Sequence, residues 1–250
     1  MNEHETYPNS RSISEPSDCS REIQRDRPDE AGKGKWGMNS EEEAKRYAEI
    51  CREDFWQKVF KAEIEYLSAR LQGSRDILSV GCGPAVIEGA LSRRGFSVTG
   101  LDVSAEALKC APDSIRTVAG RAEDMPFPEA SFDAAIFVAS LQFIENYRSA
   151  IERTSTVLRP EGIFLAMLLN PASAFFKKMK IEPDAYVHFI RHPDLREIEK
   201  EAARHFVLQT EYALGIRGEN IFESTNPSDA ALYVMVGRKA KQHQDLQGKI

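Results

Sequence analysis

Two glycines and one acidic residue have the spacing of a nucleotide-binding site. Gly81 and Gly83 follow the apolar run Ile77–Val80, and Asp102 ends a second apolar run about 20 residues further along the chain. Glycines at such a turn let a ligand approach the backbone closely, and an acid at the end of the second run accepts hydrogen bonds from ribose hydroxyls. The stretch Ile77–Asp102 therefore predicts a strand, a ligand-binding turn, a helix and a second strand.

The composition of this turn narrows the choice of nucleotide. A dinucleotide-binding turn needs a third glycine for close helix–strand packing around a pyrophosphate, and Val86 stands at that position. No Gly-Lys-Ser/Thr follows the turn, which excludes a P-loop. The turn therefore indicates a ligand that has a ribose and a compact group but no pyrophosphate. The amino-acid end of S-adenosylmethionine meets that description.

Strand-like and helical segments alternate around the turn. The expected strands are Ile77–Val80, Ser97–Leu101, Ile115–Ala119, Phe132–Val138 and Ile163–Leu169, and the expected helices are Pro84–Arg94, Ser104–Cys110 and Asn146–Leu158. A helix at Asp194–His205 and two antiparallel strands at Val207–Leu214 and Ala231–Arg238 follow. We therefore expect an α/β fold: a Rossmann-like, seven-stranded, mostly parallel sheet with helices on both faces and an antiparallel final strand.

The rest of the chain divides by composition. Residues 1–35 are polar with few large apolar side chains, so we expect a disordered tail, and residues 240–250 read as a second tail. The domain then spans residues 36–239. Its first part, residues 36–73, predicts one long helix that begins with a capping box at Ser40. The apolar, proline-flanked stretch at residues 171–190 predicts a lid-like insertion.

Four stretches together resemble a known family. They are "ILSVGCGPAVIEGAL", "VTGLDVSAEAL", "GRAEDMPFPEASFDAAIFVASLQFI" and "LRPEGIFLAML", which lie between Ile77 and Leu169. Their order and spacing resemble the class I S-adenosylmethionine-dependent methyltransferases, of the type 11 group that acts on small molecules. The resemblance implies an enzyme that uses S-adenosyl-L-methionine as its methyl donor.

The resemblance also implies roles for residues of this chain. The methionine end of the cofactor would lie on Gly81, Cys82 and Gly83, and Asp102 would hold both ribose hydroxyls. The adenine would lie between Val103 and Ala122, with Glu123 near its edge, and Phe137 and Gln142 would face the methionine and the methyl group. Two positions depart from the family pattern: Ala85 replaces the third glycine of the loop, and Arg121 replaces an acid that contacts the adenine amino group.

No fixed catalytic motif is expected, because a sulfonium is already activated toward in-line displacement. The protein mainly positions the acceptor and excludes water, and a base is needed only if the acceptor must lose a proton. The catalytic residue is therefore left unassigned, with Tyr47 and His188 as candidates. Phe55 and Trp56 are further candidates for closing over the methyl group, although plain core packing explains them as well. His188 and His192 have metal-like spacing, but Pro193 disfavours that geometry, so no metal is expected.

Composition limits the partners. The net charge is -6, with no long basic run, so no nucleic-acid partner is expected. No apolar run approaches the roughly 20 residues of a membrane span. The four cysteines are widely spaced and indicate reduced thiols in a cytoplasmic protein. We expect a small-molecule acceptor, and the oligomeric state is open.

Two alternatives remain at this point: a non-catalytic S-adenosylmethionine-binding module that engages a protein partner, and a nicotinamide oxidoreductase.

Overall fold

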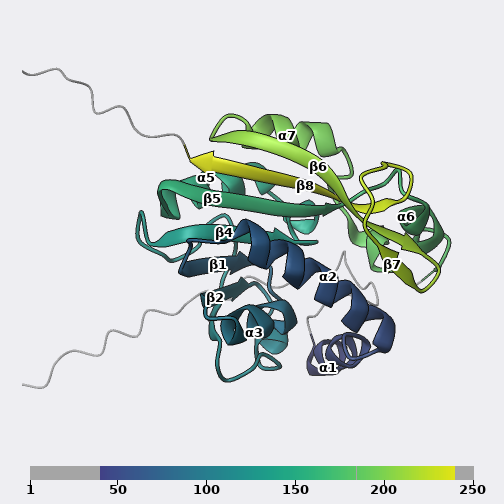
Figure 1. Ribbon diagram of the computed structural model, residues 1–250. Coiled ribbons are helices and arrows are strands. Elements are labelled where there is room, and N and C mark those ends of the chain that lie inside the picture. Colours follow the sequence, from purple (N-terminus) through teal and green to yellow (C-terminus); the bar gives the residue numbers. More distant parts are fainter. Residues whose placement is uncertain (1–39, 184, 240–250) are drawn as a thin grey trace, which may run out of the picture. The chain divides into compact units, whose positions relative to one another are not determined.

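A mixed sheet forms the centre of the part of the chain that the computed structural model describes, residues 40–183 and 185–239. Within these residues the sheet has eight strands in the order β3-β2-β1-β4-β5-β8-β6-β7 (Figure 1). The strands are β1 Asp76–Val80, β2 Ser97–Asp102, β3 Arg116–Ala119, β4 Phe132–Val138, β5 Leu158–Leu169, β6 Phe206–Arg217, β7 Asn220–Phe222 and β8 Ala230–Lys239. Strands β1 to β5 pair in parallel and β8 is antiparallel to its neighbours, as the sequence predicts. The structure places β8 between β5 and β6.

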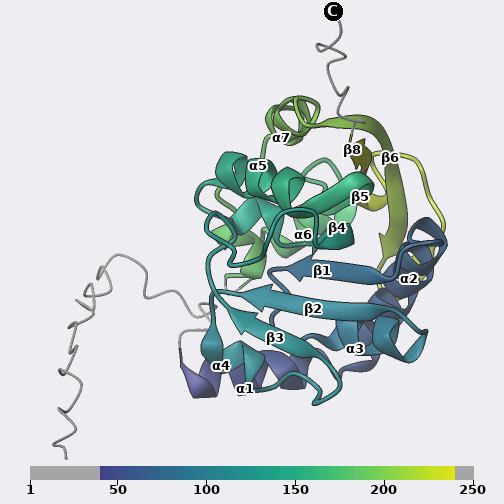
Figure 2. The same cartoon turned by 90° about the vertical axis from the view of Figure 1, so that its left-hand side faces the viewer.

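Helices cover both faces of the sheet (Figure 2). They are α1 Glu41–Ile50, α2 Asp54–Arg70, α3 Val86–Arg93, α4 Ala105–Leu108, α5 Tyr147–Val157, α6 Ala174–Met179 and α7 Leu195–Ala202, with 3-10 turns η1 Leu141–Phe143 and η2 Tyr186–Phe189. In β4, Ala135 and Phe137 belong to the apolar cluster beneath α5 and α7, whereas Ala134 and Ile136 belong to the cluster beneath α2 and α3. Burial on both faces explains why these strands are continuous apolar runs instead of alternating ones.

The expected single helix at residues 36–73 is wrong for its described part, which forms two helices. The capping box is confirmed, with Glu43 N donating to Ser40 Oγ at 3.2 Å, but α1 ends at Ile50 and α2 begins at Asp54. The intervening turn is held by Gln57 Nε2, which donates to the carbonyl of the buried Cys51 at 2.6 Å. No glycine or proline marks this turn, and the apolar spacing continues through it, so tertiary packing produces the break.

The strand count also differs from the prediction. The segment between β6 and β8 contains a short strand, β7, which pairs with the end of β6 through Gly215, Ile216 and Arg217. Its three residues carry too little pattern for a strand to be recognised. The predicted tails at residues 1–35 and 240–250 lie outside the described residues. None of the described helices is long and apolar enough to cross a bilayer.

The strand order indicates where on the sheet a ligand would bind. The chain runs outward from β1 through β2 to β3 and then returns to β4 on the other side of β1. Open α/β sheets bind ligands at the carboxyl ends of their strands, where the order reverses in this way. The turn after β1 and the residues after β4 therefore meet at the reversal point.

Candidate active site

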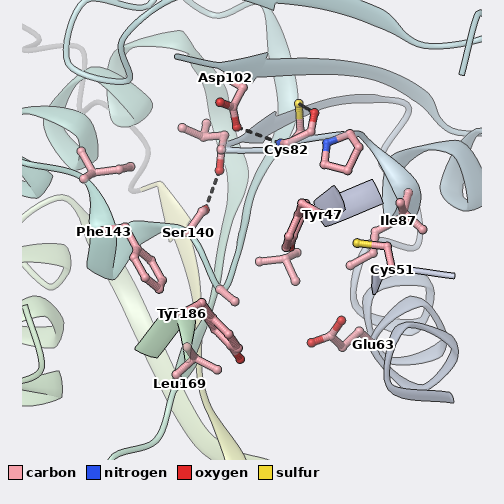
Figure 3. A pocket seen from close by; sticks show the side chains of 18 of the residues that line it. Tyr47, Cys51, Glu63, Cys82, Ile87, Asp102, Ser140, Phe143, Leu169 and Tyr186 are labelled. Atoms are coloured by element: carbon pink, nitrogen blue, oxygen red, sulfur yellow. Dashed lines mark hydrogen bonds between the residues drawn. The ribbon is translucent and has the colours of Figure 1, made fainter. Parts of the chain in front are cut away.

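A cavity of about 490 Å³ lies at this edge of the sheet. The turn after β1, the end of β2 and the residues after β3 and β4 line one part of it, and α1, α2, α6 and η2 line the other. Figure 3 shows Asp102 and Glu63 at opposite ends of the view, with Tyr47 between them. Asp102 and Glu63 both line the cavity and mark its two ends in this view.

The glycine turn exposes its backbone to the cavity. Gly81 and Gly83 adopt left-handed φ values of +74° and +52°. A Cβ on Gly81 would lie 2.5 Å from the Cβ of Ser140, closer than real Cβ atoms approach one another. Gly81 is therefore required both by its backbone conformation and by the close passage of the segment that follows β4.

The Asp102 carboxylate binds the backbone of the turn and still has lone pairs that can accept hydrogen bonds from a ligand. Its Oδ2 accepts a hydrogen bond from Gly83 N at 2.8 Å, and its Oδ1 accepts one from Ser104 N at 2.8 Å. The residue is only 7% exposed, and burial raises the pKa of its carboxyl although these N–H groups oppose the shift. A carboxylate has about four acceptor positions, so about two remain for a ligand's hydroxyl groups.

Two apolar residues line the cavity near Asp102. Val103 is 72% exposed, and Ala122 is buried. Glu123 lines the same end, where its Oε1 accepts hydrogen bonds from Asn146 N at 3.2 Å and from Arg121 at 3.1 Å. Arg121, the departure from the family pattern, is thus engaged in an ion pair with Glu123 at the rim of the cavity.

Phe137 and Gln142 do not line the cavity, which corrects their expected positions. Phe137 is fully buried under α5, with its ring centroid 5.7 Å from that of Phe164. The Gln142 amide instead braces Leu169, donating to its carbonyl at 3.1 Å and accepting from its N–H at 2.7 Å. Strand alternation directs Phe137 to the other face of the sheet. The lining positions after β4 are Val138, Ala139, Ser140 and Phe143.

Aromatic side chains enclose the end of the cavity that lies away from Asp102. They come from five separate segments: Tyr47, Trp56, Phe60, Phe143, Phe175 and Tyr186. Trp56 is central, with ring centroids 6.1 Å from Tyr186, 6.3 Å from Phe60 and 6.5 Å from Phe175. Phe55 packs against Trp56 and Phe175 but is not among the lining residues. This end suits an apolar, flat or elongated molecule.

Of the two catalytic candidates, Tyr47 lies in the cavity and His188 lies outside it. His188 is exposed, and its Nε2 lies 3.0 Å from the carbonyl oxygen of Glu182. Burial raises the pKa of Tyr47 well above its usual value, so its phenol stays neutral. Tyr47 can therefore orient a ligand but is poorly suited to take a proton. Among the described residues, no group of three or more His, Cys, Asp or Glu side chains is arranged to hold a metal.

Two cysteine thiols also line the cavity. Burial raises the pKa of Cys51 to about 11 and raises that of Cys82 further still. Both groups therefore remain protonated at neutral pH, where only a thiolate is an effective nucleophile. Thiol chemistry is not favoured in this cavity.

Two buried carboxyl groups were missed by the sequence analysis. Glu63 on α2 is 5% exposed and Glu88 on α3 is 3% exposed, and both line the cavity. Burial raises the pKa of Glu63 to about 8 and that of Glu88 to about 7, with a hydrogen bond from Ser79 to Glu88 opposing the second shift. The signal for Glu63 was its position on the apolar stripe of α2, between Val59 and Leu67.

These carboxyl groups predict a pH-dependent stability. Because their pKa values are raised above 4.5, the folded state retains protons that the unfolded state releases as pH increases. The contribution of these two groups to the free energy of unfolding should therefore be greatest below about pH 4.5. It should decline as the pH rises toward the folded-state pKa values, by up to about 1.4 kcal/mol per pH unit for each group. Thermal melts of Glu63→Gln should show a shallower decline, whereas the exposed control Glu129→Gln should keep the original slope. An unchanged slope in Glu63→Gln would refute this prediction.

The geometry of the cavity fits S-adenosylmethionine. Gly81 and Gly83 have no side chains that would keep a ligand away from the backbone of the turn. Asp102, at the end of the neighbouring strand β2, offers carboxylate oxygens as hydrogen-bond acceptors. Val103 offers an exposed apolar surface beside Asp102. A compact polar group, a ribose and a flat base thus each have a complementary surface in the order in which the cofactor carries them.

Proteins with similar sequences include several methyltransferases. A methyltransferase-domain family model matches residues 78–166. The chain is 26% identical over 188 residues to the ubiquinone biosynthesis O-methyltransferase of Chromobacterium violaceum, covering 66% of this chain and 79% of that protein. It is 33% identical over 104 residues to the fatty-acid O-methyltransferase of Mycolicibacterium smegmatis, covering 39% of this chain and 38% of that protein.

Among solved structures, an S-adenosylmethionine-dependent methyltransferase from Thermotoga maritima, described as a possible histamine N-methyltransferase, has the same fold. The TM-score is 0.69 at 16% sequence identity, over 82% of this chain and 99% of that one. At this identity the similarity concerns the fold alone.

Proposed function

We propose that this chain is a class I S-adenosylmethionine-dependent methyltransferase that methylates an oxygen atom of a small or medium-sized acceptor with a largely apolar body. The observation that carries the proposal is the aromatic enclosure around Trp56 at the far end of the cavity. Such a surface favours apolar molecules through burial of their surface and offers few polar partners.

The cofactor supplies a methyl group on a positively charged sulfur, which needs no further activation. In our proposal the backbone of Gly81, Cys82 and Gly83 holds its methionine end. Asp102 accepts hydrogen bonds from the ribose hydroxyls, and the adenine lies between Val103 and Ala122 near Glu123. The aromatic enclosure then orients the acceptor and excludes water, which concentrates the reacting atoms in one geometry.

The names of similar proteins support an apolar oxygen acceptor. One acts in ubiquinone biosynthesis as an O-methyltransferase, and another is a fatty-acid O-methyltransferase. Both names join O-methylation to molecules with apolar parts. The match to the fatty-acid enzyme spans 38% of that protein, so the acceptor of this chain is inferred from the cavity together with the names.

We also propose that the enzyme acts in the cytoplasm on a free small molecule, without a nucleic-acid partner. The described cysteines Cys51, Cys82 and Cys110 are all free thiols, which suits a reducing compartment. The net charge of -6 disfavours a polyanionic partner. The domain boundaries at residues 36 and 239 and the lid role of residues 171–190 are parts of the same proposal.

An acceptor screen with methyl-labelled S-adenosylmethionine tests the function. The panel contains alkylphenols, fatty acids and alkylamines, each with matched chain lengths. We expect label in the alkylphenols or fatty acids, with kcat/KM increasing with chain length. Transfer to amines alone would contradict the proposed oxygen acceptor, and binding of the cofactor without transfer to any probe would favour a non-catalytic role.

Trp56→Ala should damage use of the acceptor more than binding of the cofactor. Removing this ring exposes apolar surface worth about 1.5–3 kcal/mol, which corresponds to a roughly 10- to 100-fold loss in kcat/KM for the best apolar probe. Titration calorimetry should show nearly unchanged S-adenosylhomocysteine affinity. Phe55→Ala is the matched control, because Phe55 packs behind Trp56 without lining the cavity. An equal loss in both variants would argue against a direct contact.

A further inference from the structure

Glu63 is a buried acid that points into the aromatic end of the cavity. Its side chain lines the cavity from α2 and is 5% exposed (Figure 3). Within the described part of the chain, none of the hydrogen bonds and none of the ion pairs involves the Glu63 carboxyl. Buried carboxyl groups in folded proteins are normally paired or hydrogen-bonded, so an acid in this position indicates a partner that arrives with the ligands.

The neighbours of Glu63 do not supply that partner. The groups that act on it or feel its charge are Glu88 from α3, Tyr47 from α1 and Tyr186 from η2, none of which is cationic. Among the described residues that line the cavity, the cationic ones are Arg121 and Arg191, and both are exposed. Glu63 therefore lies in a region that a positive charge or a proton would stabilise.

We propose that the Glu63 carboxylate accepts the hydroxyl proton of the acceptor during methyl transfer. This inference rests on the proposed function. The acceptor oxygen forms a bond to the methyl carbon, the electron pair of the breaking carbon–sulfur bond returns to sulfur, and the O–H proton moves to Glu63. The products are the methylated acceptor, S-adenosylhomocysteine and the neutral acid of Glu63.

Charge balance within the cavity supports this role. Before transfer, the sulfonium and the Glu63 carboxylate carry opposite charges in one poorly solvated space. After transfer, the sulfur and the carboxyl are both neutral, so no uncompensated charge is left inside. Glu88 is less suited to the role because its carboxyl already accepts a hydrogen bond from Ser79 Oγ at 2.5 Å. A cation in the cavity should hold Glu63 ionised, and its loss should favour the protonated acid.

The first test measures protons and needs no acceptor. Titration calorimetry at pH 7 in phosphate and in Tris, which differ in ionisation enthalpy, gives the protons released when S-adenosylmethionine or S-adenosylhomocysteine binds. Because the pKa of Glu63 lies at about 8 without ligands, S-adenosylmethionine should release close to one proton more than S-adenosylhomocysteine. Glu63→Gln should remove most of this difference while still binding S-adenosylhomocysteine, which also shows that the variant is folded. Glu88→Gln should remove the smaller part, because Glu88 is already partly ionised at pH 7.

The second test follows the reaction of 4-propylphenol. Glu63→Gln should lower kcat by about 10²–10⁴-fold, the usual contribution of a general base. In the wild type, kcat/KM should rise with pH until Glu63 is ionised, and the variant should lack that step. Equal proton release by the two cofactor forms, or a difference that Glu63→Gln leaves unchanged, would overturn the role of Glu63 even if alkylphenols are methylated. A Glu63-dependent proton release without transfer to any hydroxyl probe would instead overturn the proposed acceptor.

Discussion

Replacing Asp102 by alanine is expected to weaken S-adenosylhomocysteine binding by about two to four orders of magnitude. Hydrogen bonds to a charged acceptor contribute roughly 1.5–3 kcal/mol each, and about 1.4 kcal/mol corresponds to a tenfold change. The variant loses the two proposed ribose contacts and also the carboxylate that accepts the N–H groups of Gly83 and Ser104. Asp102→Asn should be milder, because one oxygen can still accept, although its NH₂ must face one of these two donors. Titration calorimetry measures the affinities.

A matched control separates loss of a ligand contact from loss of support for the backbone. Asp133 is the second residue of β4, at the amino ends of the parallel strands, where its Oδ2 accepts from Arg75 N and Asp76 N at 2.9 Å each. Asp133→Ala should therefore lower the melting temperature while sparing the affinity. Near-normal affinity in Asp102→Ala, with only a lower melting temperature, would show that Asp102 supports the turn without binding the ribose.

Gly81→Ala should combine destabilisation with a near-complete loss of cofactor binding. A left-handed conformation costs a residue with a side chain about 1–2 kcal/mol, and overpacking adds about 1–3 kcal/mol. The added methyl would overlap the Cβ of Ser140, whose hydroxyl donates to the carbonyl of Val80 at 2.6 Å. The segments after β1 and β4 must then move apart, which alters both walls of the cofactor end. Thermal melts and calorimetry measure the two effects.

Gly73→Ala provides the comparison for Gly81. Gly73 has a φ of +85°, and a Cβ there would have no neighbour within 4 Å. It therefore incurs the conformational cost without the overlap, and its affinity for S-adenosylhomocysteine should be normal. Adding Ser140→Gly to Gly81→Ala should restore part of the lost stability. If Gly73→Ala and Gly81→Ala behave alike in both measurements, the contact with Ser140 has no importance.

The glycine turn and the strand ends around the proposed donor site could be predicted from sequence because their determinants are local. The glycines, the strand ends and Asp102 each have a signature within a few residues, and the parallel order follows from alternating strands and helices. Even the departure at Arg121 could be noticed, although its ion pair with Glu123 needed coordinates. Predicted strand boundaries such as Phe132–Val138 agree with the structure because burial on both faces makes the runs long and apolar.

The acceptor end could not be predicted because its determinants are long-range. Trp56 contacts Phe175 and Tyr186, which lie far along the chain, beyond five strands of the sheet. The turn between α1 and α2 has no breaker residue, since packing and not propensity produces it. Phe137 and Gln142 were assigned by family resemblance, and the exact exit of the chain from β4 decides which side chains face the cavity. Glu63 appears ordinary on a helix until its neighbours are known.

The aromatic enclosure has a consequence for how this enzyme can diversify. Its side chains come largely from α1, α2, α6 and η2, which flank the segment of residues 78–166 shared with the family model. The turn that we propose to bind the donor lies inside that segment. Mutations that change the shape of the aromatic enclosure therefore leave the turn after β1 unchanged. Related proteins can then evolve to use different acceptors while they keep the same methyl donor. Paralogues of this chain should accordingly diverge fastest in the helices before β1 and after β5.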